Sequence, residues 1–236
     1  MIRQPGAPLA QRHADDLFFY ATLGVILGGR LGYALFYAPE LLTHPANLLK
    51  LWEGGMSFHG GVLGVLAAIA WVCHQGKISF LRTADYLAVC VPPGMLFGRL
   101  ANFVNGELWG RPTDVSWAMI FPEDPTQLAR HPSQLYQAGL EGLLPLVVLL
   151  LLFWKTKARW RPGLLVGVFT VLVSIGRFVS EFFREPDAQL AEFARSTGLS
   201  MGQWLTIPLI LVGLFFVIRA LTRPPVGNQA GQPAPA

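Results

Sequence analysis

Apolar residues along this chain gather into long runs that are separated by short polar segments. Each run has roughly the length that a helix needs to cross a hydrocarbon core of about 30 Å. Barrel strands are not expected, because their short alternating segments are missing from the sequence. A helix satisfies its own backbone groups in lipid. The pattern therefore predicts an all-α, polytopic transmembrane helix bundle with about six spans, at residues 17–37, 58–74, 84–104, 136–154, 163–183 and 204–220.

The polar segments between the runs differ in length and composition. Residues 105–131 form a long segment rich in glycine and proline, which is typical of a functional loop or else of a small periplasmic head. The Pro-Pro-Gly run at residues 92–94 predicts a kink or break in the third span. We expect one membrane-embedded domain over residues 1–222. Residues 223–236, rich in Pro, Gly, Gln and Ala, are expected to form a disordered cytoplasmic tail.

Composition agrees with a membrane protein. Hydrophobic residues make up 53% of the chain and charged residues 14%, against about 25% in soluble domains. The net charge of +4 does not indicate nucleic acid, because the basic residues are spread over short loops. Ten of them fall on the side of the N-terminus and five on the other side, which predicts that both termini are cytoplasmic. The polar N-terminus has no apolar stretch typical of a cleavable signal peptide.

Three arginines lie inside the apolar runs: Arg30, Arg99 and Arg177. A charged arginine at the centre of a spanning helix costs about 2.5–3.5 kcal/mol on insertion scales, so such residues are functional candidates. The alternative is a salt bridge that only joins helices. Arg177 and Glu181 are four residues apart and share a helix face, so they can pair.

Several polar residues from different spans are expected at one depth, near the outer interface. They are His59, Arg99, Asn102 and Glu107, besides Arg177 with Glu181. The rigid fork of arginine matches phosphate, and a cationic pocket at this depth is suited to a lipid headgroup. A metal site is not expected, because His59 has no second histidine at ligand spacing. Cys73 and Cys90 are expected to be buried, inert thiols.

Five motifs stand out along the chain: GGRLGY at 28–33, GGMSFHGG at 54–61, GMLFGRLANFVNGELWGR at 94–111, HPSQLY at 131–136 and GRFVSEFFREPD at 176–187. With these motifs the chain strongly resembles bacterial prolipoprotein diacylglyceryl transferases. The resemblance runs from about residue 10 to 222, and several long motifs in the right order are far more specific than one short pattern.

The resemblance implies an activity. Phosphatidylglycerol donates its diacylglyceryl group to the lipobox cysteine thiol of a prolipoprotein, a thioether forms, and glycerol 1-phosphate leaves. This is the first step of lipoprotein maturation in the bacterial cell inner membrane. The implied partners are phosphatidylglycerol, membrane lipid and prolipoprotein signal peptides with a lipobox cysteine. The resemblance implies no metal, no organic cofactor and no nucleic acid.

The resemblance also implies residue roles. Arg99 and Arg177 match essential arginines, and the position of Arg99 binds the phospholipid. His59 is expected to act as a base or as an orienting residue. Glu181 is expected to orient Arg177. The residues expected to bind substrate are Arg30, Arg99, Asn102, Glu107, Gly110 and Glu181.

Members of the family usually have seven spans, and this chain corresponds to them from the loop after the first helix. The first family helix is therefore expected to be absent here. Two other functions remain open on the sequence. A transporter of organophosphate anions would also need buried arginines and a broken helix. A catalytically inactive, scaffold-like remnant would bind partners without forming thioether.

Overall fold

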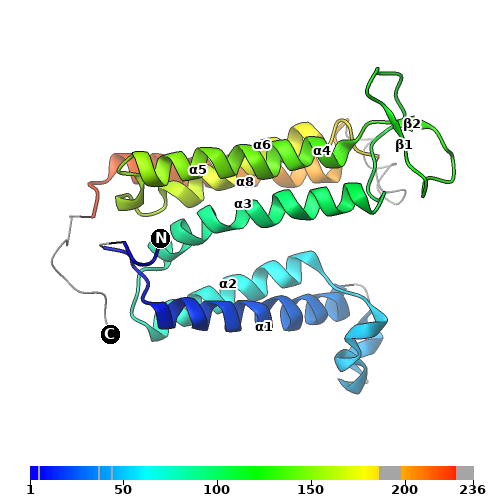
Figure 1. Cartoon of the computed structure of the whole chain (residues 1–236). Coiled ribbons are helices and arrows are strands. Elements are labelled where there is room, and N and C mark those ends of the chain that lie inside the picture. Colours follow the sequence, from blue (N-terminus) through cyan, green and yellow to red (C-terminus); the bar gives the residue numbers. More distant parts are fainter. Residues whose placement is uncertain (5, 37, 44, 186–197, 227–236) are drawn as a thin grey trace. The chain divides into compact units, whose positions relative to one another are not determined.

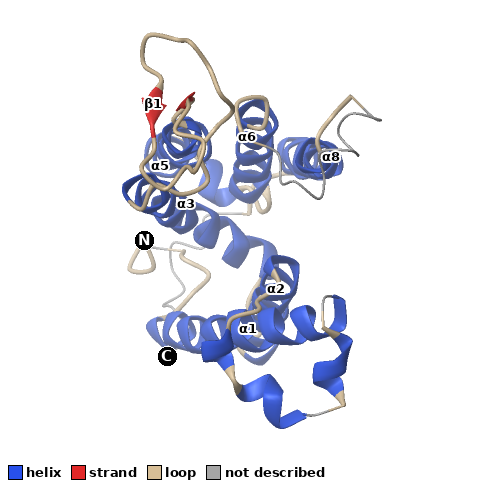
Figure 2. Ribbon diagram, turned by 90° about the vertical axis from the view of Figure 1, so that its right-hand side faces the viewer, coloured by secondary structure: helices blue, strands red, loops and turns tan. Residues whose placement is uncertain are grey.

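The computed structural model describes residues 1–226 apart from 5, 37, 44 and 186–197. These residues form two compact units, the first ending at Ala84 and the second beginning at Asp85. Figure 1 and Figure 2 show both units built almost entirely of helices. Four helices are long and apolar enough to cross a membrane, and two shorter helices are also apolar. The prediction of an all-α, polytopic membrane protein is confirmed.

In the first unit, helices α1 (Gln11–Phe36) and α2 (Phe58–Gln75) pack closely side by side. Glycines make this approach possible. A Cβ atom on Gly28 would lie 2.4 Å from the carbonyl oxygen of Gly60, and one on Gly64 would lie 2.0 Å from that of Gly24. No side chain fits at these positions. Small residues at the contact are typical of helix pairs in membranes.

Three short 3-10 helices follow α1: η1 (Pro39–Leu42), η2 (Pro45–Leu49) and η3 (Leu51–Glu53). Their exposed side chains include Leu49 and Trp52. Backbone contacts return the chain to α1, since the Ser57 N–H donates to the carbonyl of Gly29 at 2.8 Å. The hydroxyl of Ser57 then caps α2 by accepting from the N–H of Gly60.

The second unit takes in most of α3 (Phe80–Val104), which is helical throughout. Pro92 and Pro93 lie inside it, so of the predicted kink or break the break is wrong, while the kink stays a prediction. Each proline removes one backbone donor, which leaves the carbonyls of Ala88 and Val89 without their usual helical partner. The loss is local and the helix continues to Val104. Cys90 on this helix is exposed, so the expectation that it is buried is also wrong, whereas Cys73 is buried.

The head segment follows α3 and holds the strands of the second unit. Strand β1 (Met119–Ile120) pairs antiparallel with β2 (Ala129–Arg130). An isolated β-bridge pairs Gly110 of the head with Arg184, which lies after the end of α6. The head is thereby tied to the residues that follow α6.

The chain then returns through a continuous helical run. It consists of α4 (Ser133–Gln137), the π-helical turn η4 (Ala138–Leu143) and α5 (Leu144–Lys155). The 3-10 turn η5 (Ala158–Trp160) leads to α6 (Leu164–Ser180), and α8 (Met201–Thr222) ends the described helices. Helices α6 and α8 pack closely, and a Cβ on Gly167 would lie 2.9 Å from the Gly213 carbonyl oxygen.

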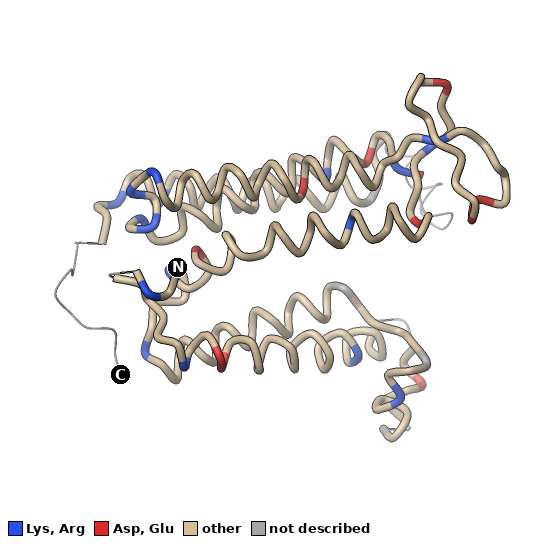
Figure 3. The backbone as a smooth tube through the Cα atoms, in the orientation of Figure 1, with Lys and Arg blue, Asp and Glu red and all other residues tan. Residues whose placement is uncertain are grey.

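Charged residues are sparse along the helices of the second unit. Figure 3 shows Lys and Arg gathered where α5 turns into α6, and acidic residues in the head. A few charges nevertheless lie within the helical bundle of this unit, which is the feature that places the candidate site.

Candidate functional site

Arg99 on α3 faces a buried carboxylate from the helical run beside it. Its Nη2 atom lies 3.6 Å from Glu141 Oε2, and the two side chains are 26% and 2% exposed. Glu141 belongs to the π-helical turn η4, a feature that is often found at functional sites because it shifts side chains off the regular helix face. Gly142 permits the approach, since a Cβ there would lie 2.6 Å from the Cα of Leu96.

Arg177 makes a second pair of opposite charges within the helical part of this unit. Its Nη2 atom lies 2.9 Å from Glu181 Oε2, one turn further along α6, and the side chains are 23% and 8% exposed. Gly202 at the start of α8 packs directly against the carboxylate of Glu181. A Cβ atom on Gly202 would lie only 3.0 Å from Glu181 Cδ. The end of α6 and the start of α8 are joined by Gln203, whose side-chain amide donates to the Phe178 carbonyl at 3.2 Å.

The two pairs form one cluster. Ser180 donates from its hydroxyl to Glu141 Oε1 at 2.9 Å, which links the carboxylate of the Arg99 pair to the helix that carries Arg177. Both Arg177 and Arg184 lie within electrostatic range of Arg99. Three cations and two carboxylates therefore share one region of the second unit. An anion that entered between the guanidinium groups would offset their mutual repulsion.

A polar corner lies at the end of α3, three residues beyond Arg99. The amides of Asn102 and Asn105 donate to Glu107 Oε1 at 2.9 and 3.2 Å. These hydrogen bonds hold the pKa of the Glu107 carboxyl below its ordinary value, with Asn102 the larger cause. Gln134 on α4 donates to the Glu107 carbonyl at 2.7 Å, which fixes the backbone of the corner.

Gly110 lies where the head meets the end of α6. Its N–H donates to the His131 carbonyl at 2.9 Å. A Cβ on Gly110 would lie 2.5 Å from the Phe183 carbonyl oxygen and 2.6 Å from that of His131, so no side chain fits. The role of Gly110 that the geometry supports is this close backbone junction.

Arg130 holds the same junction from within the head. It donates to Asp124, Thr126, Glu185 and the carbonyl of Gly110. The Arg130 hydrogen bond lowers the pKa of Asp124 from 3.8 to about 2, so this pair stays charged at neutral pH. The head is thus fixed to the segment just after the Arg177 pair.

Two predicted site residues, Arg30 and His59, belong to the first unit. His59 is exposed at the second position of α2. Arg30 is only 5% exposed, and its five N–H groups all donate to backbone carbonyls of the segment after η1. This arrangement gives Arg30 a structural role, and its substrate-binding role stays a prediction. The carbonyls belong to Asn47, Leu48, Lys50, Gly54 and Gly55.

Glu141, Ser180 and Gln134 were not among the site residues predicted from the sequence. An available signal was the acidic residue at position 141, which lies inside an apolar run just as the three arginines do. Counting acids as well as bases within the runs would have found it. Gln134 and Ser180 lie within the motifs at 131–136 and 176–187, which was the available signal, but their contacts depend on which helices are neighbours.

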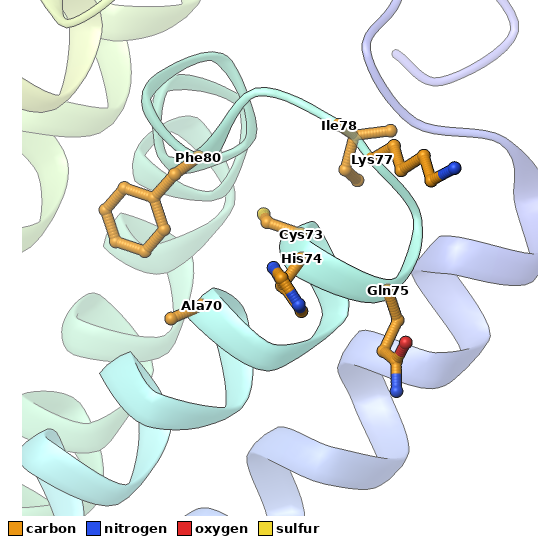
Figure 4. A pocket seen from close by; sticks show the side chains of 7 residues that line it. All are labelled: Ala70, Cys73, His74, Gln75, Lys77, Ile78 and Phe80. Carbon is orange, nitrogen blue, oxygen red and sulfur yellow. The ribbon is translucent and has the colours of Figure 1, made fainter.

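A cavity of about 680 Å³ lies elsewhere, in the first unit, where α2 ends. Figure 4 shows Cys73, His74 and Lys77 among the side chains around it. It contains none of the predicted site residues. Among the residues that the structure describes, no three His, Cys, Asp or Glu side chains lie where they could share a metal ion.

Comparison with known proteins gives a consistent result. The family model described as prolipoprotein diacylglyceryl transferase matches residues 1–219. A phosphatidylglycerol–prolipoprotein diacylglyceryl transferase of Erythrobacter litoralis is 68% identical over 228 residues, which cover 97% of this chain and 81% of the relative. Relatives with the same name from Zymomonas mobilis and Bradyrhizobium diazoefficiens are 52% and 49% identical. The matches cover 94% and 92% of this chain and 77% of each relative.

Proposed function

Since the chain belongs to the prolipoprotein diacylglyceryl transferase family, it is a membrane enzyme that transfers a diacylglyceryl group from phosphatidylglycerol to a prolipoprotein, and we propose that Arg99 and Arg177 hold the donor's phosphodiester. The observation that carries this proposal is the cluster itself. Two guanidinium groups from different helices lie in electrostatic range, each beside one carboxylate and each about a quarter exposed.

The reaction needs cations at the phosphate. The lipobox thiolate attacks the diacylglyceryl carbon that bears the phosphate ester, a C–S bond forms, and the C–O bond breaks with its electron pair going to the phosphate. Glycerol 1-phosphate leaves with one more negative charge on its phosphate than the diester had. Guanidinium groups that are held in place beforehand stabilise this developing charge more than they stabilise the starting diester, and this difference lowers the barrier.

The carboxylates have a positioning role in this proposal. Glu141 and Glu181 leave the cluster nearly neutral before the lipid binds, which limits the cost of two cations in a region of low dielectric. They also fix the direction of each guanidinium fork. Asn102 and Glu107 shape the headgroup end of the site, and Gly110 keeps the head close to α6.

The thiol must lose a proton. His59 is the candidate base or orienting group, supported by its residue type and its place in the GGMSFHGG motif. We also propose that the enzyme works in the bacterial inner membrane on signal peptides that carry a lipobox cysteine. The transport and scaffold alternatives have no observation that favours them over the enzyme.

The experiment uses the full chain, purified in detergent, with phosphatidylglycerol labelled in its headgroup glycerol and a lipobox peptide. Release of labelled glycerol phosphate should match formation of thioether peptide one to one. Arg177→Lys should slow both together, because lysine keeps the charge but lacks the fork. Turnover of that variant at the rate of the unaltered protein would contradict the proposal.

A further inference from the structure

Asp85 on α3 is a buried acidic residue that the proposed site does not use. Its side chain is 1% exposed. One carboxylate oxygen accepts from the N–H of Gly163 at 2.7 Å, and the other accepts from the N–H of Val166 at 2.9 Å. Both donors belong to the start of α6. The carboxylate therefore caps a helix other than its own.

Helix α6 needs such a cap from outside. Its N-cap residue is Gly163, which has no side chain and adopts a left-handed φ of 93°. The N–H groups of a first helical turn have no partner within the helix, and an anion there also meets the positive end of the helix dipole. Helix α8 differs, because Ser200 and Gln203 form a local capping box. Of the starts of α6 and α8, only the start of α6 is capped by a residue of α3.

Equal spacing connects this cap to the arginine cluster. Arg99 follows Asp85 by fourteen residues, and Arg177 follows Gly163 by fourteen. The two helices run in the same direction (Figure 1). Over fourteen residues each rises about 21 Å and completes nearly four turns. Because Asp85 is held level with Gly163, Arg99 and Arg177 also lie level with each other further along the two helices. Each arginine lies on nearly the same face of its helix as the residue fourteen positions before it.

We propose that Asp85 is a positioning residue that sets the axial register of α6 against α3, and thereby the alignment of Arg177 with Arg99. The catalytic consequence rests on the proposed function, whereas the register itself does not. Pro92 and Pro93 weaken the backbone hydrogen bonding of α3 between Asp85 and Arg99. The position of α3 therefore depends on a contact on each side of the prolines, that of Asp85 with α6 and that of Arg99 with Glu141. A slip of one residue moves Arg177 by about 1.5 Å and turns it by about 100°.

The test compares Asp85→Asn and Asp85→Ala in the full chain with Asp114→Asn, an exposed acid of the head, as the matched control. Cys73 and Cys90 are first replaced by alanine. Nitroxide labels at Phe97 and Ile175, both exposed, report the distance between α3 and α6 by pulsed electron paramagnetic resonance. Labels at Ile175 and Leu209 report the distance between α6 and α8.

Both Asp85 variants should shift or broaden the distance between α3 and α6, and should leave the distance between α6 and α8 unchanged. Turnover should fall by about a hundredfold while KM for the lipid changes little, as for a misplacement of about 1 Å. Asp114→Asn should change neither. If Asp85→Ala does not fold, the label distances and the turnover of Asp85→Asn test the proposal in the same way, since its amide keeps the size of the side chain.

Unchanged distances between α3 and α6, together with faster hydrogen exchange at the Gly163 and Val166 amides, would overturn the proposal and leave Asp85 as a local cap. Failure of the proposed function would look different. In that case Arg99 and Arg177 variants would turn over normally, whatever the labels report.

Discussion

Arg30 in the first unit and Arg99 in the second were equivalent on the sequence, as arginines within apolar runs. The structure separates them. Arg30 is 5% exposed and donates to five backbone carbonyls, which matches the number of N–H groups that a guanidinium has. The side chain of Arg99 is 26% exposed and forms an ion pair with one oxygen of Glu141.

The difference shows that a buried cation is not by itself evidence of a binding site. What matters is whether its donors are already used by the protein. A guanidinium whose donors are all satisfied by backbone holds a loop, as Arg30 does. One that faces a single carboxylate keeps donors for a ligand. Arg130 in the head resembles Arg30 in that its donors are used within the protein, although mostly by side chains, and Arg177 resembles Arg99.

The largest effect is expected from removing the ligand-facing guanidinium groups. Arg99→Ala and Arg177→Ala should each lower kcat by about a hundredfold to a thousandfold or more, the cost of losing one preorganised donor to a developing anion. The transfer assay with phosphatidylglycerol and lipobox peptide measures this. Arg223→Ala, an exposed arginine of the same unit, is the matched control. Near-normal turnover of either variant would remove the basis of the comparison.

Glu141→Gln should have the next largest effect. The amide keeps the size of the side chain and can still accept from Ser180, but it no longer balances the charge of Arg99. We expect turnover to fall by about tenfold to a hundredfold, because the guanidinium loses its fixed direction. Single-turnover rates at saturating lipid test this. If only lipid affinity changed, Glu141 would be a binding residue rather than a positioning residue.

Arg30→Lys should act on stability rather than on chemistry. A lysine leaves several of the five carbonyls without a donor, at about 1–3 kcal/mol for each buried group. The thermal midpoint should fall by about 5 °C or more, while the turnover of the folded protein changes far less than in Arg99→Lys. The opposite result, lost turnover at an unchanged midpoint, would place Arg30 among the substrate-binding residues.

A smaller effect is expected at Gly202→Ala. The added methyl group would lie 3.0 Å from Glu181 Cδ, so that the carboxylate must move and Arg177 with it. Turnover should fall severalfold. Gly139→Ala is the matched control, since a Cβ there meets nothing within 4 Å. Equal activity of the two variants would show that Glu181 does not depend on this contact.

The smallest effect on turnover is expected in the head, where Asp124→Asn breaks the pair with Arg130. The folded pKa of Asp124 is about 2, below its ordinary 3.8. Its contribution to stability is therefore fully present above pH 3.8 and is lost as the pH falls through about 2. The thermal midpoints of variant and unaltered protein should differ by a constant amount at higher pH and converge in acid. A difference that faded near neutral pH would contradict this pairing.

Much of the fold followed from the sequence. The six apolar runs correspond to helices, and Arg177 with Glu181 were paired by their spacing alone. The unbroken course of α3 did not follow, because the neighbouring structure decides whether a helix continues past prolines. The role of Arg30 depends on carbonyls about 17–25 residues away in the sequence. Glu141 reaches Arg99 through a π-helical turn, whose shift of phase no regular helical period would have predicted.

A double-mutant cycle on kcat/KM for phosphatidylglycerol tests most directly whether Arg99 and Arg177 hold one phosphodiester. It uses Arg99→Lys, Arg177→Lys and the double variant. If both guanidinium groups act on the same phosphate, their effects should be strongly non-additive, with a coupling free energy of about 1 kcal/mol or more. Effects that add to within about 0.5 kcal/mol would show that the two arginines act independently and would contradict the account.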